Sequence, residues 1–129
     1  MIRRIPPYLP TLLVLSAICY LSLDADPLSG RERWLDFPGS DKLVHFIMYA
    51  GLTATYCFDY YRRRITRHHY WPLVVALLAA IGVGAVLECM QAYMGIGRSG
   101  DYIDFVANSL GAIAGILAGN KLFARLMQK

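Results

Sequence analysis

The sequence predicts an all-α membrane protein with four transmembrane helices and both termini in the cytoplasm. Of the 129 residues, 57% are hydrophobic and 17% are charged, and the mean hydropathy is +0.40. A soluble domain of this size needs a more polar surface than this composition supplies. In addition, four apolar segments of about membrane length alternate with short polar loops. The length allows a single membrane domain, residues 1–129.

The first apolar segment, residues 5–23, contains no charged residue and approaches the ~20 residues that a spanning helix requires. Three prolines lie in its first turns, where proline is tolerated. Because Arg3 and Arg4 precede it, a signal peptide is the alternative interpretation. No small-residue cleavage site follows the segment, so we expect a retained helix. Cleavage would place the mature N-terminus outside and leave the other helices in the same orientation.

The other three apolar segments are residues 43–61, 72–94 and 102–119. The second segment has His45 near its start and Asp59 near its end. We expect Asp59 to be solvated or paired with Arg62 or Arg63. After residue 119 the chain ends in an amphipathic basic tail.

The distribution of basic residues sets the expected orientation, because cytoplasmic loops carry an excess of Lys and Arg. Nine of the 13 Lys and Arg residues lie in the N-terminal segment, the second loop and the tail, and four lie in or beside the first and third loops. This bias places both termini in the cytoplasm and accounts for the net charge of +4. We therefore expect the lipid bilayer, and no nucleic acid, as a partner. The oligomeric state is not predicted.

The cysteines and the sequence motifs exclude several kinds of site. Cys19, Cys57 and Cys89 are odd in number, lie in apolar segments and form no CxxC motif, so we expect packed thiols without a disulfide or zinc site. The chain carries no GxSxG, HExxH, P-loop or GxGxxG sequence. No cofactor and no resident metal is expected.

The predicted topology gathers polar residues at the extracytoplasmic ends of three helices. They are Asp41, Lys42 and His45 at the start of the second segment, Glu88 and Gln91 at the end of the third, Arg98 in the following loop, and Asp101, Asp104 and Asn108 at the start of the fourth. Within each helix their i,i+3 or i,i+4 spacing places them on one face. The sequence therefore predicts one polar site between the second, third and fourth helices.

Small residues continue the same helix faces deeper into the membrane. Below Asp104 and Asn108 on the fourth segment come Gly111, Gly115 and Gly119, and above Glu88 on the third come Ala80 and Gly84. Small residues at this spacing allow two helices to approach closely. We expect a buried seam, with an antiparallel hairpin of the last two helices bringing the Glu88 end to Asp104.

Residues 40–119 resemble the VanZ-like family of small bacterial membrane proteins. The family pattern is Asp-Lys-x-x-His, then Glu-x-x-Gln, then Arg-x-x-Asp-x-x-Asp-x-x-x-Asn-x-x-Gly. Here it reads DKLVH from Asp41, ECMQ from Glu88 and RSGDYIDFVANSLG from Arg98. The resemblance implies a multi-pass protein of the bacterial cytoplasmic membrane, at the cell envelope. The family is named for a protein linked to teicoplanin resistance, and this does not imply that the present chain confers resistance.

Three functions are consistent with these residues. In the first, the site binds a phospholipid or cell-wall precursor headgroup, with Lys42 and Arg98 as anion contacts. In the second, a membrane enzyme acts on a lipid-linked substrate, with Glu88, His45 and Asp104 as candidate acids and bases. In the third, the cluster only fixes helix packing in a structural or partner-subunit bundle. A divalent cation held by Glu88, Asp101 and Asp104 is an alternative to simple ion pairing.

Overall fold

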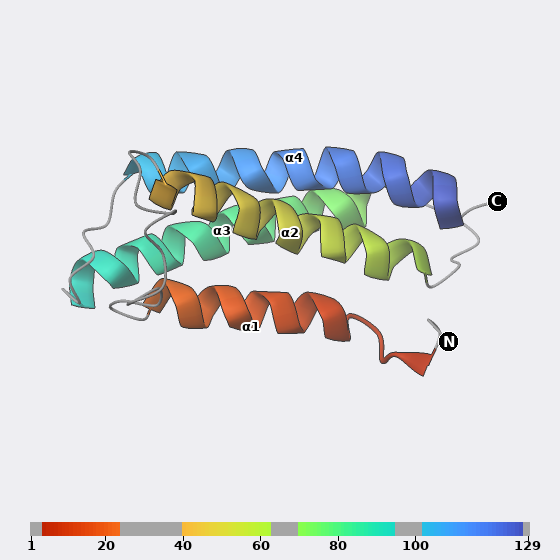
Figure 1. Cartoon of the computed structure of the whole chain (residues 1–129), viewed down its shortest axis with the longest axis horizontal. Coiled ribbons are helices and arrows are strands. Elements are labelled where there is room, and N and C mark those ends of the chain that lie inside the picture. The colour runs from red at the N-terminus through yellow and green to blue at the C-terminus, as the bar shows by residue number, and fades with distance from the viewer. Residues whose placement is uncertain (1–3, 24–39, 63–69, 95–101, 128–129) are drawn as a thin grey trace.

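The computed structural model describes residues 4–23, 40–62, 70–94 and 102–127, which contain four helices and no strand. The helices are α1 (Leu9–Leu23), α2 (Ser40–Arg62), α3 (Trp71–Met94) and α4 (Tyr102–Met127). They alternate in direction, so that the start of α1 and the end of α4 lie at the same end of the bundle (Figure 1). The predicted all-α class is confirmed.

Both terminal helices differ in length from the prediction. The chain enters α1 only at Leu9, because two successive prolines precede Tyr8 and Tyr8 itself has φ of 60°. At the other end, the basic tail is helical and extends α4 to Met127. Its Phe123 ring packs edge-on against Phe58 of α2, with ring centroids 5.5 Å apart. The tail is rich in good helix formers, which favours the continuation.

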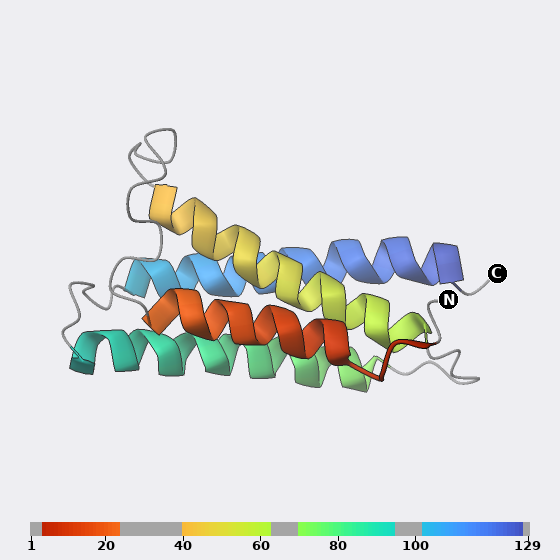
Figure 2. The same ribbon diagram turned by 60° about the horizontal axis from the view of Figure 1, so that its bottom comes forward.

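The most extensive helix contact joins α2 and α4, and the glycines of α4 make it possible. A methyl group added at Gly111 would lie 2.2 Å from the Phe46 carbonyl oxygen, and one at Gly115 would lie 2.2 Å from that of Ala50. Figure 2 shows α2 crossing α4 along this contact. The expected seam therefore exists, but its glycines face α2 and not α3. A stripe of small residues identifies a packing face without specifying the helix that covers it.

The core is shared by all four helices. One cluster of buried side chains consists of Ile18, Tyr49, Leu52, Ala80, Leu87 and Ala112. A second cluster, towards the opposite end of the bundle, consists of Cys57, Tyr60, Tyr61, Leu73 and Ile116. The three cysteines lie in described helices as free thiols. Cys57 is buried, as expected of a packed thiol, whereas Cys19 is half-buried and Cys89 is exposed, so the expectation of packed thiols is wrong for Cys89.

The exterior of the bundle is strongly apolar, while several polar and charged residues are buried. Large apolar side chains such as Leu13, Leu78 and Leu117 are more than 60% exposed. The segments Trp71–Met90 and Ile103–Leu126 are long and apolar enough to cross a membrane, and Leu9–Leu21 is a shorter apolar helix. An exterior of this kind is unfavourable in water and suits contact with lipid.

At the end of the bundle where α1 begins, Asp59 and Arg62 connect α1 to α2. Asp59 is fully buried and accepts hydrogen bonds from the Thr11 backbone N–H (3.0 Å), the Thr11 hydroxyl and Arg62 Nε (2.7 Å). Arg62 also donates to the carbonyl oxygens of Ile5 and Pro6. The predicted pairing of Asp59 with Arg62 is confirmed, and the solvated alternative is wrong. We refer to Thr11, Asp59 and Arg62 as the α1 anchor.

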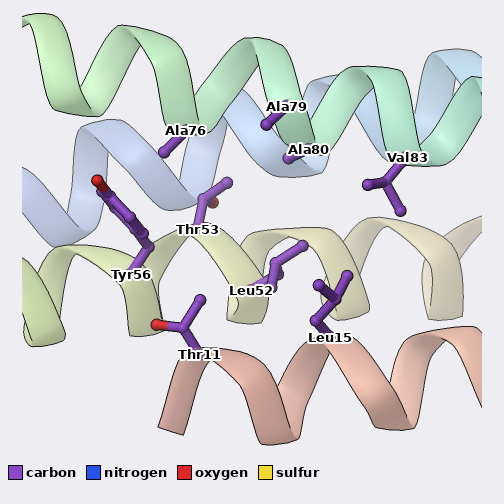
Figure 3. A pocket seen from close by; sticks show the side chains of 9 residues that line it. All are labelled: Thr11, Leu15, Leu52, Thr53, Tyr56, Ala76, Ala79, Ala80 and Val83. Atoms are coloured by element: carbon purple, nitrogen blue, oxygen red, sulfur yellow. The ribbon is translucent and has the colours of Figure 1, made fainter. Parts of the chain in front are cut away.

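A cavity of about 150 Å³ lies between α1, α2 and α3 (Figure 3). It is lined by Thr11, Leu15, Leu52, Thr53, Tyr56, Ala76, Ala79, Ala80 and Val83. Most of its lining is apolar, and the residues that α3 contributes are small. The Thr53 hydroxyl at its edge donates to the Ala112 carbonyl oxygen (2.9 Å). Because α1 packs loosely here, its attachment depends more on the α1 anchor.

Candidate functional site

The starts of α2 and α4 and the last turns of α3 lie at the same end of the bundle, opposite the α1 anchor (Figure 1). Five described residues at this end are Lys42, His45, Glu88, Asp104 and Asn108, which we call the polar site. All except Lys42 are buried, with exposed fractions between 1% and 8%. The predicted convergence of residues from three helices is therefore present among the described side chains.

An ion pair joins α2 to α4 in the polar site. Lys42 Nζ lies 3.2 Å from Asp104 Oδ1, with the lysine side chain 34% and the aspartate side chain 11% exposed. Asp104 is in the first turn of α4, where the helix dipole favours a carboxylate. Lys42 is near the start of α2, where the dipole disfavours a cation, so its pairing with Asp104 offsets an unfavourable position.

The buried imidazole of His45 lies on the inner side of this pair. Its Nε2 atom is 4.0 Å from Asp104 Oδ2. Ligand atoms of His45, Glu88 and Asp104 all lie within 4.8 Å of one another. Two carboxylates and an imidazole at this spacing form a compact group of proton acceptors. Burial penalises neighbouring charged carboxylates, and the Lys42 ammonium offsets the charge of Asp104.

Several buried polar atoms of the polar site and of the neighbouring Tyr49 form no hydrogen bond with the described residues. They are His45 Nδ1, the Tyr49 hydroxyl and Asn108 Oδ1. Most buried polar atoms in native proteins are hydrogen-bonded, so a group of such atoms in one place indicates room for a polar ligand, an ion or water. Tyr49 is fully buried, and Glu88 lies close enough to influence it electrostatically.

Gly84 of α3 leaves room for Asn108 of α4 and Tyr49 of α2 to pack closely against α3. A methyl group added there would lie 3.3 Å from Asn108 Nδ2 and 3.6 Å from Tyr49 Cε1. Gly84 is one turn before Glu88 on the same helix face. The stripe of Gly84 and Glu88 predicted from the sequence therefore borders the polar site.

The remaining predicted residues are not all described. Asp41 and Gln91 belong to α2 and α3, but their side chains lie outside the described part of the structure. Arg98 and Asp101 lie outside the described residues altogether. Conversely, the sequence interpretation missed Tyr49. Its i,i+4 spacing from His45 is the signal that could have identified it.

A comparison with protein-family models supports the resemblance noted from the sequence. The model of the VanZ/LLP1 family matches residues 11–123, which is most of the chain. The chain belongs to the VanZ/LLP1 family. No significant match was found among curated proteins or among solved structures. In this VanZ/LLP1 protein, the two long apolar helices and the family membership together indicate a membrane protein.

The geometry of the VanZ/LLP1 polar site is compatible with two kinds of chemistry. Lys42 is partly exposed, so its ammonium group can contact an anionic group that approaches from outside. Behind it, His45, Glu88 and Asp104 can accept or donate protons, depending on their protonation. The matched residues include the whole polar site.

Proposed function

We propose that this VanZ/LLP1 protein is a multi-pass protein of the bacterial cytoplasmic membrane, with both termini in the cytoplasm. In this arrangement all four helices span the membrane, and α2 crosses with Lys42 held in an ion pair near its start and with Asp59 and Arg62 paired near its end. Most Lys and Arg residues lie in the N-terminal segment, the second loop and the tail, at the helix ends opposite the polar site, and this distribution supports the orientation. The polar site then faces the extracytoplasmic side.

We further propose that the polar site binds the headgroup of a phospholipid or cell-wall precursor. The observation that carries this proposal is a partly exposed lysine above a buried group of acids, imidazole and unpartnered polar atoms. Lys42 would contact the phosphate or carboxylate of the headgroup. His45 Nδ1, the Tyr49 hydroxyl and Asn108 Oδ1 would form hydrogen bonds with its hydroxyl or amino groups, which suits the lack of a partner for these three atoms among the described residues.

The undescribed members of the predicted site complete this proposal. Arg98 would be a second anion contact, because a guanidinium binds phosphate and carboxylate with two parallel hydrogen bonds. Asp41, Gln91 and Asp101 would orient the headgroup at its rim. Their role follows from the sequence pattern alone and rests on the family resemblance.

Replacing Lys42 by glutamine is expected to weaken the binding of anionic lipid about tenfold, since a charge-assisted hydrogen bond contributes roughly 1.5–3 kcal/mol. The probes are phosphatidylglycerol and undecaprenyl phosphate, titrated into protein in neutral detergent and measured by native mass spectrometry. The matched control is Lys121→Gln, which removes an exposed lysine at the other end of α4. Equal binding by both variants would contradict the proposal.

A membrane enzyme acting on a lipid-linked substrate is the second candidate. It is favoured by the separation of 4.0 Å between His45 Nε2 and Asp104 Oδ2, with Glu88 beside them. These distances suit acid and base groups that tighten around a substrate. In this case Glu88→Gln would retain lipid binding and lose turnover.

A link to glycopeptide susceptibility is also part of the proposal, through the family resemblance. We expect Glu88→Gln and Asp104→Asn, like Arg98→Ala, to abolish the effect of the protein on teicoplanin susceptibility at normal membrane abundance. The measurement is the minimum inhibitory concentration in a host in which the wild-type chain changes it, with abundance followed by immunoblotting. Loss of folded protein in all three variants would instead support a structural bundle.

A further inference from the structure

Three helices bring one imidazole and two carboxylates together in the interior of the bundle. His45 comes from α2, Glu88 from α3 and Asp104 from α4, and all three are more than nine-tenths buried. Their ligand atoms lie within 4.8 Å of one another, and His45 Nε2 is 4.0 Å from Asp104 Oδ2. With metal–ligand bonds of about 2.0–2.2 Å, two ligands of one ion lie up to about 4.4 Å apart. Small side-chain rotations would therefore bring the three residues around one ion.

The unpartnered atoms around these three residues are a second, independent observation. The Tyr49 hydroxyl and Asn108 Oδ1 are buried and have no hydrogen-bond partner among the described residues. Both residues contact the Gly84 position, one turn before Glu88. A metal ligand is commonly oriented by a hydrogen bond from a neighbouring residue, and a metal-bound water requires similar partners. A hydroxyl such as that of Tyr49 can donate to a carboxylate ligand, and an amide oxygen such as Asn108 Oδ1 can accept from a metal-bound water.

The charges in the cluster also favour a cation. Glu88 and Asp104 are two neighbouring buried carboxylates, and Lys42 compensates Asp104 from a partly exposed position. Neighbouring buried carboxylates are unfavourable unless a cation or a proton offsets their charge. A mixed set of imidazole and carboxylate ligands suits transition metals better than Mg²⁺ or Ca²⁺, which prefer oxygen alone.

We propose that His45, Glu88 and Asp104 bind one divalent transition-metal cation, for which Zn²⁺ and Mn²⁺ are the fitting ions. Three protein ligands leave further coordination positions for water or for a bound molecule. The Lys42 ammonium competes with the metal for Asp104, because both bind the same carboxylate. Loss of the Lys42 ammonium is therefore expected to strengthen metal binding and to weaken headgroup binding.

The test uses purified full-length protein in detergent, stripped with a chelator and titrated with Zn²⁺ against a chromogenic competitor, or with Mn²⁺ by electron paramagnetic resonance. The starting chain carries His68→Ala, His69→Ala and Cys89→Ser, because adjacent imidazoles and an exposed thiol bind the same ions. We expect one ion per chain. His45→Gln, Glu88→Gln and Asp104→Asn should each weaken binding at least about tenfold, with folding checked by circular dichroism.

Lys42→Gln separates this inference from the headgroup proposal and leaves all three metal ligands in place. We expect it to strengthen metal binding several-fold while it weakens the binding of anionic lipid. A stripped starting chain that takes up no stoichiometric ion would overturn the metal site. So would folded ligand variants that bind as tightly as the starting chain, or a Lys42→Gln chain whose metal affinity is unchanged. None of these results would affect the lipid measurement.

Discussion

Replacing Gly111 or Gly115 by alanine is expected to lower the free energy of unfolding by about 3 kcal/mol, at the upper end of overpacking effects. The added methyl group would lie 2.2 Å from the backbone carbonyl oxygen of Phe46 or Ala50. A backbone oxygen cannot rotate away as a side chain can, so α2 and α4 must separate. The measurement is thermal or denaturant unfolding in detergent, followed by circular dichroism.

Two glycines of the other helices provide the control. Alanine at Gly51 of α2 or Gly82 of α3 would meet no atom within 4 Å. Because alanine favours the helix over glycine, these variants should be as stable as the wild type or more stable by up to about 1 kcal/mol. Gly119→Ala should be intermediate, since its methyl group would lie 3.0 Å from Cys57 Cβ. Equal stability of Gly111→Ala and Gly82→Ala would show that the α2–α4 contact is not limited by backbone approach.

The same contact determines the geometry of the polar site. Phe46, which Gly111 contacts, directly follows His45 on α2, and Gly111 is two turns below Asp104 on α4. Any separation of the two helices therefore also lengthens the ion pair of Lys42 with Asp104 and the approach of His45 to it. The close helix contact and the polar site are parts of one interface.

The fold class and the position of the polar site could be predicted because both depend on periodicity. Glu88 is four residues after Gly84, and Asn108 is four residues after Asp104, so each pair shares one face of its helix near the helix end. The structure brings these polar residues together. Periodicity does not identify the partner of a face. For this reason the sequence pairs the glycines of α4 with the small residues of α3, whereas in the structure they pack against α2.

Tyr49 and Asp59 show a second limit of the sequence. A tyrosine within an apolar segment is typical of a packed or lipid-facing residue, and only the three-dimensional structure reveals that its hydroxyl has no hydrogen-bond partner among the described residues. Asp59 lies next to arginines at a helix end, which is equally compatible with exposure. Its complete burial depends on its contact with Thr11 of α1, which is 48 residues earlier in the chain.

Replacing Asp59 by alanine is expected to destabilise the protein by about 3–5 kcal/mol, as removal of one partner of a buried ion pair does. The change removes the acceptor of three hydrogen bonds and leaves Arg62, whose side chain is 6% exposed, without this carboxylate. Because the cavity leaves α1 loosely packed, α1 should detach from α2 before the rest unfolds. Faster alkylation of Cys19, located by peptide mass spectrometry, would report this detachment.

Smaller changes at the α1 anchor test the cause. Thr11→Ala removes one hydroxyl donor and should cost about 1 kcal/mol. Ser16→Ala is the control on the same helix, because the Ser16 hydroxyl donates only within α1 on an exposed face, and it should have almost no effect. The double variant Asp59→Ala with Arg62→Ala should recover part of the lost stability, since the Arg62 guanidinium then no longer has to stay at this position without the Asp59 carboxylate. If Asp59→Ala were as stable as Ser16→Ala and Cys19 stayed protected, packing and not the α1 anchor would hold α1 in place.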